Sequence, residues 1–221
     1  MTSGWLRRRA AIERAVAGLM AVVLAPLLAA VAGIVWVADR AAPLIALPRV
    51  GRNRNVFPMW KVRTMAPHAE GPRIAAAADS RVTAVGRWLR RTRLDELPQL
   101  LNVLRGEMAI IGPRPEAPAF VDGDQRWDRT LAVPPGLTGL SQVVVHAWEL
   151  EQLGEEADER VYRERVLPVK LELDEWYVQN ATPRVDLLIL VATLQRVVLR
   201  SRRTVVGSLD AVRRLPPAVL G

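Results

Sequence analysis

The sequence predicts a mainly helical α+β fold with an N-terminal membrane helix, a small β-hairpin and interfacial amphipathic helices. Three observations lead to this fold class: a long uncharged segment near the N-terminus, a short run of strand-forming residues after it, and apolar residues at helical spacing in much of the remainder. The 221 residues, half of them hydrophobic, suffice for one domain and a membrane element. The absence of cysteine excludes a disulfide framework and a cysteine nucleophile.

The membrane segment is Ala15–Ala38, in which 24 consecutive residues carry no charge. A helix of this length crosses roughly 30 Å of hydrocarbon, and it is longer than the apolar core of a signal peptide. Basic residues precede and follow it: Arg7, Arg8, Arg9 and Arg14 on one side, and Arg40, Arg49, Arg52 and Arg54 on the other. Both flanks then belong on the cytoplasmic face, and Pro26 can break the helix at its middle. We therefore expect a re-entrant helix rather than a single span.

The next segments predict a hairpin, a loop and a helix. Val50–Arg63 is expected to form a β-hairpin that turns at Asn53–Asn55 and brings Lys61 to the candidate site. Residues 65–80 are rich in Ala, Pro and Gly and predict a loop. Residues 82–93 predict a helix. It places three arginines on neighbouring positions of one face: Arg87, Arg90 and Arg91.

Two adjacent carboxylates, Asp95 and Glu96, follow this helix. An apolar stripe with helical spacing comes after them, formed by Leu97, Leu100, Leu101 and Leu104. Since Pro98 is tolerated only in the first turn of a helix, we expect a core-facing helix that begins near Leu94 or Asp95. The two acids would lie at its N-terminus, where the N–H groups and the helix dipole favour ionised carboxylates and bound anions.

The acidic pair and the arginines around it suit a phosphate-bearing substrate and a nucleophilic carboxylate. Adjacent residues point about 100° apart on a helix, so the two acids cannot act as a face-to-face dyad, but they can converge on one divalent cation. Mg²⁺ is the expected ion because it prefers oxygen ligands and bridges phosphates. The formal charge of +8 suits anionic lipids, nucleotides or nucleic acid alike.

The second half of the chain predicts a loop at 121–129 and a turn at Pro134–Gly136, which is either a connector or a phosphate-binding turn. An acidic helix or loop is expected at 149–164. Two helices are expected at 167–179 and from Thr182 onward, the second with a short apolar core on the bilayer or in the domain interior. Basic residues close the sequence: Arg200, Arg202, Arg203, Arg213 and Arg214.

Four motifs occur in order along the chain: Lys61-Val-Arg-Thr-Met65, Leu94-Asp-Glu-Leu-Pro-Gln-Leu100, Gly112-Pro-Arg-Pro115 and Pro135-Gly-Leu-Thr-Gly139. They resemble the signatures of the bacterial sugar transferases, the monotopic polyprenyl-phosphate phosphoglycosyl transferases. The resemblance runs from about residue 11 to residue 200. It implies transfer of a sugar 1-phosphate from a UDP-sugar to polyprenyl (undecaprenyl) phosphate through a covalent aspartyl intermediate. UMP is released, and the reaction is the first membrane step of glycan assembly.

The resemblance also implies residue roles. Asp95 matches the nucleophile, and Glu96 matches its companion, which orients the site; both are the expected Mg²⁺ ligands. Lys61, Arg90 and Arg114 match positions at which the family places phosphate-binding cations. Arg114 is the most persuasive of the three because a proline on each side restricts its backbone.

The expected partners are a UDP-sugar, polyprenyl phosphate and membrane lipids, without nucleic acid, and a homodimer is left open. The expected location is the cytoplasmic face of the bacterial inner membrane. We expect three parts: a membrane-anchoring re-entrant helix at 1–40, a cytoplasmic catalytic domain at 41–200 and a basic C-terminal tail at 201–221.

One motif departs from the family pattern. The segment Gln142-Val-Val-Val-His146 lacks the Asn-Gly turn and the arginine with which family members often continue, so the sugar stays unassigned. His146 is expected to be a structural residue beside an apolar strand rather than a replacement cation. Two other functions are weighed: a catalytically silent scaffold of a glycan assembly complex, and a membrane-tethered nucleic-acid binder. The intact Asp95 disfavours the first, and the lack of a recognisable reading helix disfavours the second.

Overall fold

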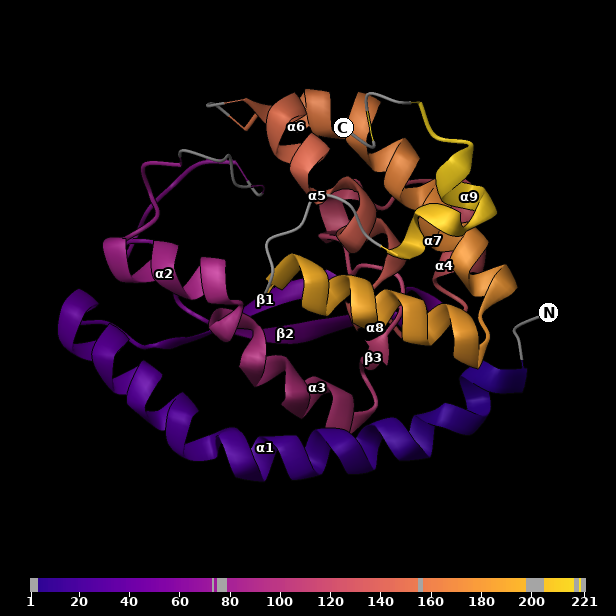
Figure 1. Cartoon of the computed structure of the whole chain (residues 1–221). Helices are drawn as coiled ribbons and strands as arrows, with labels where there is room; N and C mark the ends of the chain where they lie inside the picture. Colours follow the sequence, from indigo (N-terminus) through magenta and orange to yellow (C-terminus); the bar gives the residue numbers. More distant parts are fainter. Residues whose placement is uncertain are drawn as a thin grey trace.

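The computed structural model describes residues 4–72, 74, 79–154, 157–197, 205–216 and 219. This part of the chain is mainly helical, as predicted, with two small sheets (Figure 1). The α-helices are α1 (Gly4–Asp39), α2 (Ala84–Thr92), α3 (Leu100–Arg105), α4 (Arg126–Thr130), α5 (Leu140–Leu153), α6 (Glu159–Val161), α7 (Leu167–Asn180), α8 (Pro183–Val197) and α9 (Asp210–Arg213). The strands are β1 (Leu44–Val50), β2 (Val56–Val62), β3 (Ala109–Ile111) and β4 (Gly136–Thr138). Short 3-10 helices are η1 (Arg52–Arg54), η2 (Leu94–Gln99), η3 (Pro118–Phe120) and η5 (Val205–Ser208), and a π-helical turn is η4 (Tyr162–Val166).

Helix α1 contains the predicted membrane segment. Its most apolar window of 18 residues has a mean hydropathy of 2.5, and only 11% of that window is buried. The helix is thus long and apolar enough to cross a membrane, and its low burial distinguishes it from the core helix of a soluble domain. The backbone stays helical through Pro26, without the break that we expected, and Figure 1 shows a continuous arc beneath the rest of the molecule. A gradual bend accommodates the proline.

Strands β1 and β2 form the predicted hairpin and pair in antiparallel register along their whole length. The turn lies at η1, where Asn53 has a φ of 57°, a left-handed conformation that asparagine adopts more readily than most residues. The hairpin is longer than predicted because β1 begins at Leu44 rather than at Val50. Pro48 faces Pro58 across the two strands, and proline weakens the sequence signal for a strand.

The helical segment of the acidic pair begins at Leu94, as predicted, with both acids in its first turn, but it begins as a 3-10 helix rather than as an α-helix. The predicted helix before the pair is confirmed as α2, but the chain then passes through Arg93, whose φ is 58°. Asp95 and Glu96 lie in the 3-10 helix η2, and α3 begins only at Leu100. The left-handed residue at the start of η2, together with Pro98 inside it, favours this tight short helix over one long α-helix.

The apolar stripe of this segment faces the core only in part. Leu100 is buried, whereas Leu101 and Leu104 are 41% and 39% exposed. A Cβ added at Gly18 of α1 would lie 3.3 Å from Leu104, so α3 packs directly on the membrane helix. The glycine permits this close approach of the two helices.

Strands β3 and β4 pair in parallel, with Ile111 opposite Thr138. Glycine is required at position 136, because the two backbones approach closely there: a Cβ on Gly136 would lie 2.0 Å from the nitrogen of Gly112. The N–H of Gly136 donates to the carbonyl of Pro113 at 2.8 Å. This N–H therefore bonds within the backbone, and whether another N–H group of this turn, such as that of Gly139, meets a phosphate stays a prediction.

Two helices of the second half of the chain are predicted correctly, and two others are not. α7 and α8 confirm the two C-terminal helices, and the Thr182 hydroxyl accepts a hydrogen bond from the N–H of Val185 at 3.3 Å. By contrast, the strand expected beside His146 is part of α5, and α4 lies partly in the expected loop at 121–129. Three consecutive β-branched residues are typical of a strand, but the side chains of Val143–Val145 pack into the core as part of a helix.

The largest hydrophobic core lies between α5, α7, α8 and the C-terminal segment, around Tyr177 and Ile189. Val206 and Val212, from the segment expected to be a basic tail, contribute to this core. The tail residues Arg200, Arg202 and Arg203 lie outside the described residues. The division of the chain at residues 40 and 200 stays a prediction.

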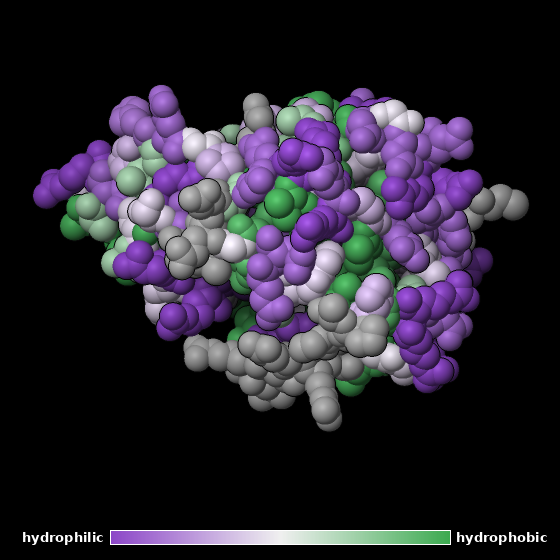
Figure 2. Space-filling model, turned by 90° about the horizontal axis from the view of Figure 1, so that it is seen from above, coloured by the Kyte–Doolittle hydropathy of each residue, from purple (hydrophilic) through white to green (hydrophobic). Residues whose placement is uncertain are grey.

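Most of the large apolar side chains that the structure exposes belong to α1, α3 and α8. On α8 they follow one another at helical spacing: Leu187, Leu190, Val191 and Leu194. Figure 2 views the molecule from above, so that α1 lies on the far side, and hydrophilic residues predominate on the face that it shows. The apolar surface is thus concentrated on the three helices rather than spread evenly.

Candidate active site

Asp95 and Lys61 form a buried ion pair. Strand β2 packs against η2, and the Nζ of Lys61 lies 2.7 Å from Oδ2 of Asp95, with side chains 18% and 2% exposed. The other carboxylate oxygen, Oδ1, is buried and has no hydrogen-bond partner among the described residues. A buried oxygen without a partner is unfavourable for stability, and a bound ligand or water would remove that cost. The hairpin thus brings Lys61 to Asp95, and the role of the pair stays a prediction.

Glu96 faces three cations. Nη1 of Arg93 lies 3.3 Å from its Oε1. Burial alone would raise the pKa of Glu96, but the charges of Arg93, Arg114 and Lys61 hold that pKa below its usual value. Glu96 is therefore ionised at neutral pH, next to the buried Asp95.

Arg90 is the arginine of the α2 face whose pKa responds to the charge of Asp95. Its Nε donates to the hydroxyl of Thr64 at 2.9 Å. Burial lowers the pKa of Arg90, and the nearby charge of Asp95 opposes that effect, so the guanidinium stays cationic. Arg87 instead donates to a backbone carbonyl of the preceding turn, and Arg91 is exposed. These two arginines belong to the surface of α2.

Arg114 follows β3 with a proline on each side. Its backbone N–H donates to Oδ2 of Asp174 at 3.1 Å. Burial lowers the pKa of Arg114, but nearby carboxylates outweigh burial and raise it: Glu96, Glu116 and Glu149. Arg114 also lines a small cavity with Glu96 and Gln142. The guanidinium is thus held at a cavity beside the acidic pair, where a phosphate could accept its hydrogen bonds.

A buried cluster behind Arg114 escaped the sequence analysis. Nζ of Lys170 lies 3.2 Å from Oε1 of Glu116, 3.1 Å from Oε1 of Glu149 and 2.8 Å from the hydroxyl of Tyr162. Both carboxylates also act on Arg114, so the cluster sets the charge environment of that guanidinium. Two signals were available: Glu116 follows the Pro-Arg-Pro motif directly, and Lys170 and Asp174 interrupt a mainly apolar face of their helix one turn apart.

His146 lies in α5, near the same cations. Burial lowers its pKa to about 4, and the charges of Arg93 and Arg114 act in the same direction, against Glu149. The imidazole is therefore neutral at neutral pH. It does not supply the positive charge of the arginine that is missing from this motif, which favours a structural role for His146.

Asp174 gives the first testable prediction. Burial raises its pKa to about 7, although the neighbouring Ser141, the hydrogen bond from the Arg114 N–H and the charge of Lys170 oppose the shift. The folded pKa lies above the unfolded value of about 3.9, so the stabilising effect of the proton is complete below that value and is lost as the pH rises toward 7. We expect Asp174→Asn, which cannot ionise, to become progressively more stable than wild type between pH 5 and pH 8, by on the order of 1–4 kcal/mol.

The measurement is the difference in thermal unfolding midpoint between Asp174→Asn and wild type across this pH range. The titration of His146 is common to both proteins and cancels in the difference. Asp128→Asn is the control, because Asp128 is an exposed carboxylate that pairs with Arg54. A difference that stays constant with pH would show that Asp174 does not titrate in this range.

Comparisons with known proteins agree with the motif order. The family described as bacterial sugar transferase matches residues 5–200. An Aeromonas hydrophila protein named UDP-N-acetylgalactosamine-undecaprenyl-phosphate N-acetylgalactosaminephosphotransferase is 34% identical over 181 residues, which cover 78% of this chain and 39% of that protein. An undecaprenyl-phosphate glucose phosphotransferase of Komagataeibacter xylinus is 41% identical over 135 residues, covering 57% and 25%.

A third relative is a UDP-glucose:undecaprenyl-phosphate glucose-1-phosphate transferase of Caulobacter vibrioides. It is 40% identical over 142 residues, which cover 62% of this chain and 53% of that protein. The chain thus spans between a quarter and about half of the length of these three relatives. With the family match across residues 5–200, it belongs to the bacterial sugar transferase family.

Proposed function

We propose that this protein transfers a sugar 1-phosphate from a UDP-sugar to polyprenyl phosphate. The buried pair of Lys61 and Asp95 carries the proposal: one carboxylate oxygen bonds the ammonium group, and the other finds no hydrogen-bond partner in the part of the chain that the structure describes. A carboxylate that is oriented by a cation and keeps one oxygen unbonded suits attack on phosphorus. The names of the three relatives support the same reaction class.

The proposed reaction has two displacements at one phosphorus atom. In the first, an oxygen of Asp95 attacks the β-phosphorus of the donor, and the bond from this phosphorus to the bridging oxygen breaks. UMP leaves with that oxygen and its electron pair, and the sugar phosphate stays on Asp95 as a mixed anhydride. In the second, an oxygen of polyprenyl phosphate attacks the same phosphorus, and the carboxylate of Asp95 is restored. Lys61, Arg90 and Arg114 neutralise phosphate charge in both steps.

Asp95 and Glu96 fit a magnesium ion in donor chemistry. Both are carboxylates, and Glu96 is ionised and lines the small cavity that it shares with Arg114. Across the described ranges no group of three or more His, Asp or Glu residues could hold a metal. The protein would thus contribute one or two carboxylates, as is usual for Mg²⁺ bound with a phosphate substrate. When bound, the ion would neutralise charge on the phosphates.

Glu96→Gln is expected to weaken the magnesium dependence of the reaction. Loss of one carboxylate charge should raise the Mg²⁺ concentration for half-maximal rate by roughly 10-fold or more. Binding of Mn²⁺, followed by electron paramagnetic resonance, should weaken in parallel. Glu172→Gln, at an exposed carboxylate of α7, is the control. An unchanged Mg²⁺ titration would remove Glu96 from the metal site.

The sugar is tested by a screen of donors. The names of the relatives specify N-acetylgalactosamine and glucose, so these UDP-sugars come first. We expect UMP release that depends on both a suitable donor and undecaprenyl phosphate. If no UDP-sugar gives UMP release with a folded, membrane-bound preparation, the transferase function is rejected. The catalytically silent scaffold of a glycan assembly complex would then be the remaining function. Nucleic-acid binding with a steep salt dependence would instead identify the third alternative.

We propose that the chain binds the bacterial inner membrane from its cytoplasmic face, with both ends of α1 on that side. Near the start of α1, Nε1 of Trp5 donates to Asp186 of α8 at 2.6 Å. Near its end, Val35 packs with Val62 of the hairpin. A helix that contacts one domain at both ends lies along that domain, which supports re-entry rather than a span. The exposed apolar side chains of α3 and α8 would add to the same membrane surface.

Pro26→Leu is expected to convert re-entry into a span, because it restores the missing N–H and removes the ring that bends the helix. We would introduce Ser3→Cys and Ser80→Cys separately into this cysteine-free chain and label intact cells with an impermeant thiol reagent. Both cysteines should be protected with Pro26 present, and one flank should become labelled in Pro26→Leu. Ala25→Leu, which keeps the proline, is the control. Labelling of Ser3→Cys alone in the presence of Pro26 would overturn the re-entrant topology.

A further inference from the structure

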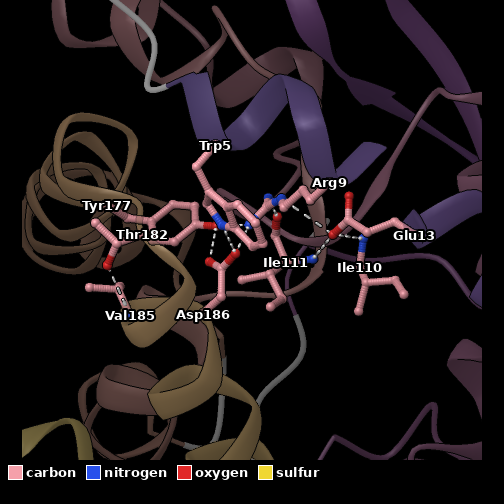
Figure 3. A network of polar contacts seen from close by, with 9 residues as sticks. All are labelled: Trp5, Arg9, Glu13, Ile110, Ile111, Tyr177, Thr182, Val185 and Asp186. Carbon is pink, nitrogen blue, oxygen red and sulfur yellow. Dashed lines mark hydrogen bonds and ion pairs between the residues drawn. The ribbon is translucent and has the colours of Figure 1, made fainter. Parts of the chain in front are cut away.

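A buried polar network joins the first turns of α1 to the rest of the domain (Figure 3). Asp186 accepts hydrogen bonds from Nε1 of Trp5 at 2.6 Å and from the hydroxyl of Tyr177 at 2.8 Å. Arg9 donates to the same hydroxyl at 2.6 Å, and also to Asp186 and to the backbone carbonyl of Ile111. The side chains of Arg9 and Asp186 are each only 7% exposed. An arginine so deeply buried is held by all of these partners together.

Glu13, one turn after Arg9, extends this network to the backbone of β3. Its Oε1 accepts hydrogen bonds from the N–H groups of Ile110 at 3.1 Å and Ile111 at 3.3 Å, and lies 3.5 Å from Nε of Arg9. Two side chains of the membrane helix thus bind both N–H and carbonyl groups of one strand. We call Trp5, Arg9, Glu13, Tyr177 and Asp186 the α1 clasp.

The strand that the clasp holds leads directly to Arg114. β3 ends at Ile111, and the next backbone groups are fixed in turn. The N–H of Gly112 donates to the carbonyl of Thr138 at 2.9 Å, and the N–H of Arg114 donates to Asp174 at 3.1 Å. Pro113 restricts the backbone between these anchors, and Pro115 restricts the backbone of Arg114 itself. A displacement of β3 is therefore transmitted to Arg114 over two residues, Gly112, whose N–H is bonded, and Pro113, whose ring is rigid.

We propose that Arg9 and Glu13 are positioning residues for Arg114. They bind no substrate themselves; they seat β3 so that the guanidinium of Arg114 stays beside the acidic pair. This inference rests on the phosphate-binding role proposed for Arg114. It makes the membrane helix part of the support of the active site, because the first turns of α1 hold β3, the strand that leads to Arg114.

Glu13→Ala tests the inference. It leaves two buried N–H groups of β3 without a partner, so we expect kcat/KM for the UDP-sugar to fall by about 10-fold or more. A contact to the diphosphate acts on the bound donor as well as on the transition state, so KM should rise more than kcat falls. The control is Arg8→Ala, at an exposed arginine of the same helix, which should match wild type. All rates are taken well below the unfolding midpoints.

A double-mutant cycle separates positioning from a general loss of stability. If Glu13 acts through Arg114, Glu13→Ala should have little further effect on kcat/KM in an Arg114→Lys background. Additive losses would overturn the inference. Glu13→Gln keeps an acceptor oxygen and should recover most of the activity. If Glu13→Ala does not fold, the cycle is run with Glu13→Gln, whose smaller loss should likewise vanish in the Arg114→Lys background, and additivity there overturns the inference too.

Hydrogen exchange keeps this inference separate from the proposed function. Amides of residues 108–116 should exchange faster in Glu13→Ala than in wild type and in Arg8→Ala. Absence of UMP release from wild type with every donor would reject the transferase, and the exchange result would still decide whether the clasp holds β3. Unchanged exchange at 108–116 in Glu13→Ala would overturn the clasp, whatever the activity.

Discussion

Asp95→Asn is expected to abolish turnover and the covalent intermediate together. Asparagine has nearly the shape of aspartate and still offers an acceptor to Lys61, but its neutral amide is not a nucleophile. We expect UMP release to fall by roughly 10⁴-fold or more. Intact-mass measurement with the UDP-sugar alone should find an added sugar phosphate on wild type and none on the variant.

The control for this change is Asp128→Asn, at an exposed carboxylate that pairs with Arg54 on the surface. It should retain the wild-type rate and the adduct. Near-normal turnover of Asp95→Asn, or a sugar phosphate adduct on it, would remove Asp95 as the nucleophile. An adduct on wild type that polyprenyl phosphate does not discharge would contradict the second displacement instead.

The sequence motifs predicted which charged residues lie close together. Each of these residues lies in a different short motif and could be identified from that motif alone: Lys61, Asp95 and Arg114. The motifs did not predict the 3-10 helix to which Asp95 belongs. The choice between an α-helix and a 3-10 helix at Asp95 depends on the left-handed Arg93 and on the packing of β2 against η2. These are tertiary influences, which override the helical spacing of the leucines that follow.

The supporting network could not be predicted because its partners lie far apart in the sequence. Lys170 meets Glu116 across 54 positions, and Arg9 meets Asp186 across 177. A single sequence marks such residues only as isolated charges, and isolated charges are usually solvated. The two local signs were Glu116, directly after the Pro-Arg-Pro motif, and Lys170 on the buried face of α7, where a charge requires a buried partner.

Lys61→Met is expected to affect both rate and stability. Methionine fills a similar volume but leaves the buried carboxylate of Asp95 without its cation. Breaking a buried pair in this way costs about 3 kcal/mol, taken at the lower end of the range because the Lys61 side chain is 18% exposed. The thermal unfolding midpoint should fall by roughly 6–12 °C. UMP release should fall by about 100-fold or more, since a phosphate-binding cation is lost.

The double variant Lys61→Met/Asp95→Asn decides whether the ion pair is the cause. It removes both buried charges, so it should be more stable than Lys61→Met alone, while it stays inactive because the nucleophile is absent. Arg63→Met is the matched control: it removes one positive charge two residues away, where the guanidinium donates to an exposed backbone carbonyl at 2.9 Å, and should change stability by no more than about 1 kcal/mol. If the stability losses of Lys61→Met and Asp95→Asn simply add in the double variant, Lys61 does not stabilise the charge of Asp95. The ion pair would then no longer support the proposed function.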